Sequence, residues 1–344
     1  MRSITKVFKR CSFFTGFLLL FAACNHTVKQ QTFSGYALGT TYTISYFDTA
    51  ENARLSKAVD SVFYEINKSM STYLANSDIS KINRGDSAIK VDAHFVRVFE
   101  KSVSVWKNTR GYFDPTVGAL VNAYGFGPGK SLDVVTPNHR DSLLSFTGLN
   151  KVVLTPDYRV VKEDTRLYID FNAIAKGYAV DVLCELMEQL GYQDFLVEIG
   201  GELRTSGFQQ IKKSAWKVAI DHPEQGVDRT FLKTLSLSDK ALATSGNYRK
   251  FSVDSLTGER FVHTLNPHTG TARPSKVLSA SVVADNCMTA DAYATALMAM
   301  PLEYISQMDR KEFEYFLVLA ADNGDYEYKI SPGFQAMLNV ALQP

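Results

Sequence analysis

Two oxygen-bearing residues four positions apart are the first feature of the sequence that could do chemistry. Asp291 and Thr295 lie in a run of small and apolar residues from Ala290 to Met300, which is followed by Pro301. On a helix, positions i and i+4 share one face, so both oxygens project to the same side. Mg²⁺ takes oxygen ligands, commonly one or two carboxylates together with water and substrate phosphates. The pair therefore fits a magnesium site, although helix capping by Asp291 and core packing of Thr295 would explain the same residues.

A second segment, Asp170 to Gly177, is suited to an anion. We expect Asp170 to close a strand and Asn172 to cap a helix that stops at Gly191. Small residues at the start of this helix leave amide N–H groups that a phosphate can approach closely. Lys176, one turn inside, could add a positive charge to the anion or be an ordinary solvated lysine.

Aromatic residues and one histidine complete the set of candidate side chains. Tyr124, Gly125 and Phe126 combine rings with flexible backbone, which suits a stacked flat heterocycle and also suits a tight turn. Tyr73 is a second candidate for a ring contact. His263 heads a His-x-x-x-Pro-x-x-Gly string. Because a neutral imidazole can take a proton from a hydroxyl group near pH 7, His263 is the candidate base, with a structural histidine as the alternative.

The hydrophobic pattern indicates the elements that must position these residues. Period-two alternation predicts strands and helical spacing predicts helices. Strands are expected at 41–47, 195–199 and 217–220, a hairpin at 152–154 with 159–161, and helices at 55–68, 93–109, 174–190 and 290–300, the last capped by Thr289. Strands and helices do not alternate strictly, so the predicted class is α+β, with mixed sheets and packed helices in one large bilobed unit. No G-x-G-x-x-G follows a strand and no P-loop lysine motif occurs, so neither standard nucleotide-binding fold has its sequence fingerprint here.

The N-terminus predicts export and a lipid anchor. A basic segment without acids precedes an apolar stretch from Cys11 to Ala23, shorter than the roughly 20 residues that span a bilayer. The stretch ends in Phe21-Ala22-Ala23-Cys24, which resembles the lipobox of bacterial lipoproteins. We expect residues 1–23 to be a lipoprotein signal peptide, Cys24 to be acylated, residues 24–32 to be a tether and residues 33–344 to form one domain. An ordinary signal peptide with an incidental cysteine is the alternative.

Composition excludes some partners and a disulfide framework. The chain has 37 Lys and Arg against 36 Asp and Glu, and removal of the basic leader leaves a net charge of about −3, so no nucleic-acid partner is indicated. Beyond Cys24 only Cys184 and Cys287 remain. Cys184 falls on an apolar helical face, and we expect both thiols to be free and buried.

Seven segments in sequence order resemble the FAD:protein FMN transferase family, whose members are often called ApbE-like proteins. They are 38–42, 70–73, 113–127, 170–177, 243–248, 263–270 and 289–295. The resemblance covers the chain from about Phe33 to its end. It implies a T-fold-like domain over residues 33–344 that uses Mg²⁺ to split FAD and transfers the FMN half to a Thr or Ser hydroxyl of an acceptor protein, releasing AMP.

The resemblance also implies roles for individual residues. The metal would be held by Asp291, Thr295 and a backbone oxygen near Ala173, while His263 and Asp291 would be catalytic. Flavin contacts are expected at Leu38, Tyr73, Tyr124, Gly125, Phe126, Asp170, Lys176 and Leu265. The family commonly has Met at the position of Leu38 and Trp at that of Tyr124.

The implied partners are flavin-bearing subunits of membrane redox complexes, which a lipid-anchored enzyme facing the periplasm would meet. Two alternatives remain open at this point. One is hydrolysis of FAD to FMN and AMP, and the other is a flavin-binding lipoprotein without catalysis.

Overall fold

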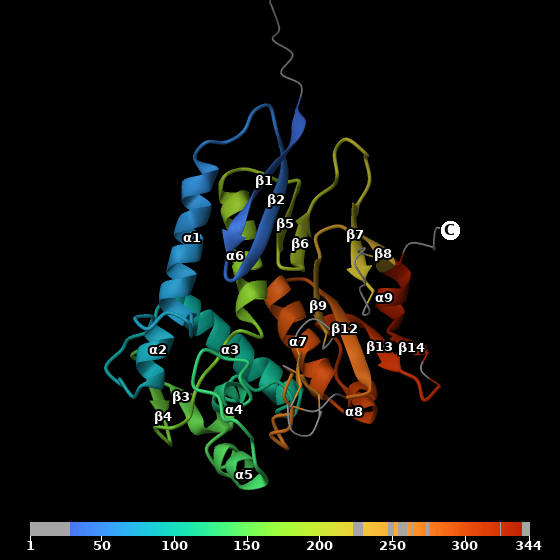
Figure 1. Cartoon of the computed structure of the whole chain (residues 1–344). Coiled ribbons are helices and arrows are strands. Elements are labelled where there is room, and N and C mark those ends of the chain that lie inside the picture. Colours follow the sequence, from blue (N-terminus) through green and yellow to red (C-terminus); the bar gives the residue numbers. More distant parts are fainter. Residues whose placement is uncertain are drawn as a thin grey trace, which may run out of the picture.

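An eight-stranded antiparallel sheet runs through the computed structural model of the chain (Figure 1). The structure describes residues 28–222, 230–246, 251–253, 260–262, 264–272, 275–323 and 325–338. In spatial order the strands are β1 (Lys29–Ala37), β2 (Thr40–Asp48), β5 (Phe195–Ile199), β6 (Glu202–Ser206), β9 (Ala241–Gly246), β12 (Val277–Ala284), β13 (Phe313–Ala320) and β14 (Tyr326–Ile330). Short hairpins are formed by β3 (Val152–Leu154) with β4 (Val160–Lys162), β7 (Trp216–Asp221) with β8 (Phe231–Leu237), and β10 (Phe251–Val253) with β11 (Arg260–Val262).

Helices cover the sheet and fill the space beyond its end. They are α1 (Leu55–Met70), α2 (Asp78–Asn83), α3 (Ala93–Asn108), α4 (Gly118–Ala123), α5 (Pro137–Ser145), α6 (Ala175–Gln189), α7 (Cys287–Ala299), α8 (Leu302–Gln307) and α9 (Pro332–Met337). The predicted α+β class is confirmed. The strands predicted at 41–47, 195–199 and 217–220, the hairpin, and the helices predicted at 55–68, 93–109 and 174–190 form within one or two residues of their expected bounds, whereas the last helix starts three residues earlier than expected.

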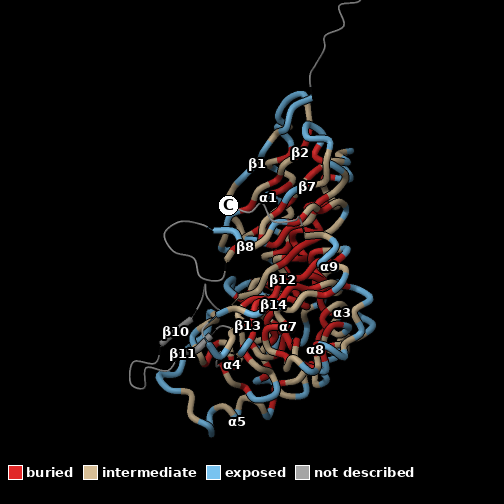
Figure 2. The backbone as a smooth tube through the Cα atoms, turned by 90° about the vertical axis from the view of Figure 1, so that its right-hand side faces the viewer, coloured by how far each residue is buried: buried red, intermediate tan, exposed pale blue. Residues whose placement is uncertain are grey.

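Alternation along the strands explains how one sheet supports two hydrophobic layers. Successive strand side chains point to opposite faces. On β13, Leu317 belongs to the core shared with α1, α3, α6 and α7, whereas Phe316 and Val318 pack on the other face with β7, β8 and α9. Figure 2 shows that the buried residues are concentrated along the middle of the molecule. Cys184 and Cys287 are free and buried in the first layer, as predicted.

Helix α6 does not begin as the sequence predicts. Tyr168 makes only an isolated bridge to Val117, and Asp170 follows it in irregular backbone rather than closing a strand. The N-cap of α6 is Ile174, without a side-chain cap. Asn172 instead donates from its backbone N to Oδ1 of Asp170 at 2.7 Å and from Nδ2 to Oδ2 at 3.1 Å. This local turn competes with capping and delays the helix.

Helix α7 begins earlier than predicted, at Cys287. Its N-cap is Asn286, whose side chain accepts a hydrogen bond from the backbone N of Thr289 at 2.9 Å. The Asp181 carboxylate on α6 accepts from the amides of Cys287 and Met288, both at 2.8 Å. These partners satisfy the first turn of α7, so Thr289 lies inside the helix and is not its cap.

At the N-terminus, β1 includes residues expected in the tether. Lys29 to Thr32 pair with β2 in register with Asp48 to Ser45. The signal peptide and Cys24 lie outside the described residues, so export and acylation stay predictions. Within the described part of the chain, no helix has the length and apolar character to cross a membrane.

Candidate active site

The crossing of α6 and α7 brings the predicted metal ligand to the predicted anion-binding helix. The backbone N of Gly177 donates to Oδ2 of Asp291 at 2.9 Å, and Asp291 is buried. A Cβ atom at position 177 would lie 2.3 Å from the carbonyl oxygen of Cys287 and 2.7 Å from Cβ of Asp291. Glycine therefore permits the close approach that holds this carboxylate at the start of α6.

An ion pair lies beside this crossing. Nζ of Lys176 is 2.6 Å from Oε1 of Glu202, at the start of β6, and the Glu202 side chain is 7% exposed. Burial raises the pKa of Glu202, and the neighbouring ammonium group opposes the rise. Burial lowers the pKa of Lys176, but the charges of Asp291 and Glu202 outweigh it and keep the net pKa above its ordinary value. Oε2 of Glu202 is buried and has no hydrogen-bond partner among the described residues.

Two of the predicted oxygen donors, Asp291 and Thr295, lie four positions apart on α7. Thr295 is half-buried on the same helix as Asp291, and its hydroxyl lies 3.4 Å from Oγ of Ser245 on β9. Ala173 is half-buried in the turn that precedes α6. Among the described residues, no three His, Cys, Asp or Glu side chains gather closely enough to hold a metal ion. A cation site here would therefore combine one carboxylate, one hydroxyl and backbone oxygen, which suits a hard cation such as Mg²⁺.

The start of α6 is less open to an anion than the sequence predicts. The backbone N of Ala175 donates to the Phe171 oxygen at 2.8 Å, and the amide of Gly177 is taken by Asp291. Two of the first amides in the helix are thus already paired. An anion at this point would be attracted by the Lys176 ammonium group more than by an exposed helix terminus.

Asp170 links this centre to the predicted aromatic contacts. Its backbone N donates to the Pro115 oxygen at 2.7 Å, and burial raises the pKa of its carboxyl, although hydrogen bonds from Asn172 oppose the rise. Asn172 also donates to Oγ1 of Thr72 at 3.4 Å, next to Tyr73, which is 63% exposed. The 70–73, 113–118 and 170–173 segments therefore meet, with the Tyr73 ring accessible to a ligand.

Two tight hairpin turns lie side by side next to the ion pair. Leu38 and Gly39 both have positive φ, 51° and 76°, in the turn between β1 and β2. In the turn between β5 and β6, Gly200 donates from its backbone N to the Thr41 oxygen at 3.0 Å, just before Glu202. Positive φ at both central residues matches the type I′ geometry of two-residue hairpins. The partly buried Leu38 packs against the main core at this end of the sheet.

A separate small cluster contains the remaining aromatic candidates. Tyr124 and Phe126 pack with the buried Leu265, and the Tyr124 hydroxyl donates to the Gly270 oxygen at 3.1 Å. Gly125 has φ 79° and follows α4, where its amide donates to the Asn122 oxygen. The turn at Gly125 thus ends α4, and the neighbouring Tyr124 contacts the 264–272 segment through Gly270. His263 lies outside the described residues, so its role as base stays a prediction.

Comparisons with known proteins decide the family. The ApbE family model matches residues 38–317. The FAD:protein FMN transferase of Vibrio cholerae is 34% identical over 322 residues, covering 91% of this chain and 95% of that protein. The Haemophilus influenzae protein of the same name is 31% identical over 93% of this chain and 94% of that protein. The chain belongs to the ApbE family. The solved structure of the flavin transferase ApbE from Vibrio cholerae matches with a TM-score of 0.81 at 31% identity, covering 91% of this chain and all of that one.

Membership of the ApbE family confirms the enzyme class predicted from the motifs, FAD:protein FMN transferase, and the α+β fold. Sequence reasoning gave no role to Glu202 or Asp181, and it included Gly177 in the 170–177 segment without predicting its contact with Asp291. The sequence does contain a signal for Glu202, because this acidic residue comes directly after two glycines and before an apolar residue. A charge at the start of a buried strand needs a partner of opposite charge. Nothing in the local sequence reveals the partner, because Lys176 lies 26 positions earlier.

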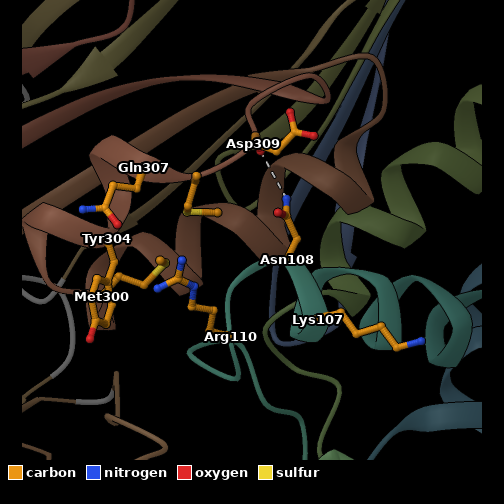
Figure 3. Close-up of a pocket in the computed structure, with 8 residues that line it drawn as sticks. Lys107, Asn108, Arg110, Met300, Tyr304, Gln307 and Asp309 are labelled. Atoms are coloured by element: carbon orange, nitrogen blue, oxygen red, sulfur yellow. Dashed lines mark hydrogen bonds between the residues drawn. The ribbon is translucent and has the colours of Figure 1, made fainter.

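A pocket elsewhere in this ApbE protein is separate from these residues (Figure 3). It lies where α3 and α7 end and α8 begins. Its lining residues are Lys107, Asn108, Arg110, Met300, Tyr304, Gln307, Met308 and Asp309. From Asp291 to Met300, α7 rises by about 13 Å, so the pocket lies toward the opposite end of the helix from the candidate metal ligand.

Replacement of Thr289 by valine is expected to stabilise the protein. The Thr289 hydroxyl is buried and has no hydrogen-bond partner in the part of the chain that the structure describes, and an unsatisfied buried hydroxyl costs about 1 kcal/mol or more. Valine keeps the shape and removes the polar atom, so we expect the free energy of unfolding to rise by about 1 kcal/mol. Urea denaturation measures this change. An equal loss of stability would instead reveal a hydrogen bond made by Thr289.

Proposed function

We propose that this chain is a Mg²⁺-dependent enzyme that transfers FMN from FAD to a Thr or Ser hydroxyl of an acceptor protein and releases AMP. The observation that carries the proposal is the α6–α7 crossing, where Asp291 accepts from Gly177 one residue away from Lys176. A carboxylate for a cation and an ammonium group for a phosphate are thereby fixed at one point. Family membership over residues 38–317 supports the same reaction.

Asp291, Thr295 and a backbone oxygen near Ala173 would hold the magnesium ion. One oxygen of Asp291 already accepts from Gly177, so the second oxygen is the one suited to a metal. Bound Mg²⁺ would neutralise charge on the FAD pyrophosphate. The protein itself holds its carboxylate in place through a backbone hydrogen bond, which lowers the reorganisation needed when ligands bind.

Lys176 would bind and orient the pyrophosphate. Glu202 holds its ammonium group at 2.6 Å, which restricts a side chain that otherwise has many rotamers. Tyr73, Tyr124 and Phe126 would contact the flat rings of FAD, together with Leu38 and Leu265. Asp170, which is buried and donates from its backbone N to the Pro115 oxygen, would be a further flavin contact.

His263 would take the proton from the attacking hydroxyl group. A neutral imidazole can accept a proton near pH 7, as a general base requires. The His263 segment continues into residues 264–272, which contact Tyr124 through Gly270. That contact brings the residues that follow His263 in the sequence to the turn at Gly125, which is why this segment is proposed to take part in the reaction.

The proposed setting is the periplasmic side of a membrane. A lipoprotein signal peptide over residues 1–23 and acylation at Cys24 would tether the domain there. The proposed acceptors are flavin-carrying subunits of membrane redox complexes, which expose Thr or Ser to the same compartment.

Incubation of the chain with FAD, Mg²⁺ and a candidate acceptor protein, followed by intact mass and nucleotide analysis, tests the reaction. An acceptor that gains the mass of FMN while AMP is released supports the transferase. Free FMN and AMP in the presence of the acceptor would instead indicate a pyrophosphatase. Intact FAD under all conditions would indicate a binding protein, and the same assay without Mg²⁺ tests the metal requirement.

Replacement of Glu202 by glutamine is expected to raise the Mg²⁺ concentration needed for half-maximal transfer by about tenfold. Without the Glu202 charge, Asp291 is the carboxylate left to attract the Lys176 ammonium group, and Mg²⁺ must compete with it. Glu188→Gln, which changes a half-exposed carboxylate 3.7 Å from Arg204, is the matched control. Magnesium titrations of both variants measure the effect, and an unchanged midpoint in Glu202→Gln would contradict it.

A further inference from the structure

The loop between β6 and β7 is rigidly held although it lies on the surface. Its first amides are bound by two acids: Gly207 N donates to Asp239 at 2.8 Å and Phe208 N to Asp194 at 2.6 Å. Gln209 is 7% exposed, and its Oε1 accepts from the backbone N of Lys212 at 2.6 Å. The fixed carboxylates of Asp194 and Asp239 thus point toward the loop backbone.

This ordered loop displays two large apolar side chains and two cations. Phe208 is 59% exposed and Ile211 is 64% exposed. Lys212 and Lys213, which follow directly, are exposed as well. Large apolar side chains on a restrained loop cannot turn inward to escape water, so they favour a partner surface. Adjacent aromatic, aliphatic and basic groups match the boundary of an anionic lipid layer.

The loop lies beside the point where the chain enters the fold. Nε2 of Gln209 donates to Oε1 of Gln30 at 2.9 Å, and Gln30 is the second residue of β1. Cys24 is five positions before Lys29, so an extended chain between them spans at most about 17 Å. An anchor at Cys24 would therefore keep the loop close to the lipid surface.

We propose that the loop from Gly207 to Ser214 is a membrane-contact surface that inserts Phe208 and Ile211 into an anionic lipid layer. This inference uses the lipid anchor of the proposed function for its setting, but the contact itself is a property of the loop. In β1, Gln30 lies at the end near the loop, whereas Leu38 lies in the turn at the other end. The strand spans about 30 Å, so the turn at Leu38 and the candidate active site beside it would lie about that far from the lipid surface. At that height the site would meet the parts of membrane-bound acceptors that protrude from the membrane.

Vesicle binding by the chain from Asn25 tests the surface without the anchor. All described core residues lie between Tyr42 and Phe334, so this chain keeps the whole core. We expect it to sediment with vesicles containing a third phosphatidylglycerol, and Phe208→Ser with Ile211→Ser to weaken this binding about tenfold. Lys212→Gln with Lys213→Gln should weaken it by a similar factor and remove its salt dependence. Val153→Ser, at a residue 57% exposed on β3, is the control.

A probe on the mature anchored protein gives an independent test. Cleavage of the leader removes Cys11, acylation occupies the Cys24 sulfur, and Cys184 and Cys287 are buried, so a polarity-sensitive maleimide dye can be directed to Ile211→Cys, with Val153→Cys as the control. We expect the emission of the dye to shift to the blue in proteoliposomes when it is attached at position 211, and to stay unchanged when it is attached at position 153. Absence of vesicle binding or of the emission shift overturns the proposal. The proposal is also overturned if the wild-type protein is a dimer in solution and the variant with Phe208→Ser and Ile211→Ser is a monomer. That variant should transfer FMN to a soluble acceptor at the wild-type rate, so failure of the surface and failure of the reaction are distinguishable.

Discussion

Asp291→Asn is expected to lower the rate of FMN transfer about a thousandfold while the protein stays folded. Asparagine keeps an oxygen that can accept the Gly177 amide, which Asp291 now accepts at 2.9 Å. It removes the negative charge that a magnesium ion needs, and Thr295 with backbone oxygen cannot replace that charge. The loss should therefore appear in activity and in Mg²⁺ binding, measured by initial rates and by calorimetry, with little change in melting temperature.

The matched control for this substitution is Asp285→Asn. Asp285 precedes α7, and its side chain is 81% exposed beside Lys240, so the same change of charge occurs close by in solvent. We expect wild-type transfer from this variant. Full activity in Asp291→Asn at the same Mg²⁺ concentration would remove Asp291 from the metal site, and a large loss of melting temperature would show that its main role is to hold the two helices together.

Features that depend on local pattern were predictable from the sequence. Asp291 and Thr295 lie on one helix, as their i, i+4 spacing predicts. Helix α6 ends just before Gly191, which has φ 89°. The start of α7 was not predictable, because Asp181 on α6 supplies the acceptor for its first amides across 106 positions of sequence. A side chain from another helix thus made the expected cap, Thr289, unnecessary.

The candidate site follows the same division. The motifs identified which residues carry chemistry, but the ion pair between Lys176 and Glu202 and the pairing of the α6 amides arise only when β6 and α7 meet α6. The local sequence predicts free amides at the start of α6, but the Gly177 amide donates to Asp291 on α7. Acylation at Cys24 and the role of His263 stay predictions, since neither residue is among those described.

Gly177→Ala is expected to destabilise the protein by about 3 kcal/mol. Alanine at a helical position would by itself contribute up to about 1 kcal/mol of stability relative to glycine. Here its Cβ would lie 2.3 Å from the Cys287 carbonyl oxygen, a backbone atom of α7 that cannot rotate away. The overlap outweighs the gain in propensity, so α6 and α7 must separate. We expect a melting temperature lower by roughly 6 °C or more.

The separation should impair transfer even where the variant is folded. The amide of residue 177 would move from the Asp291 carboxylate, which it now contacts at 2.9 Å, and displacements near 1 Å lower rates by about a hundredfold. Gly191→Ala, beyond the other end of α6, is the control: φ is 89° there but no atom lies within 4 Å of the new Cβ. It should lose about 1 kcal/mol through backbone strain and keep its activity. Equal melting temperatures and rates for Gly177→Ala and wild type would show that the helices can separate without consequence, and that the crossing is not what places Asp291 beside Lys176.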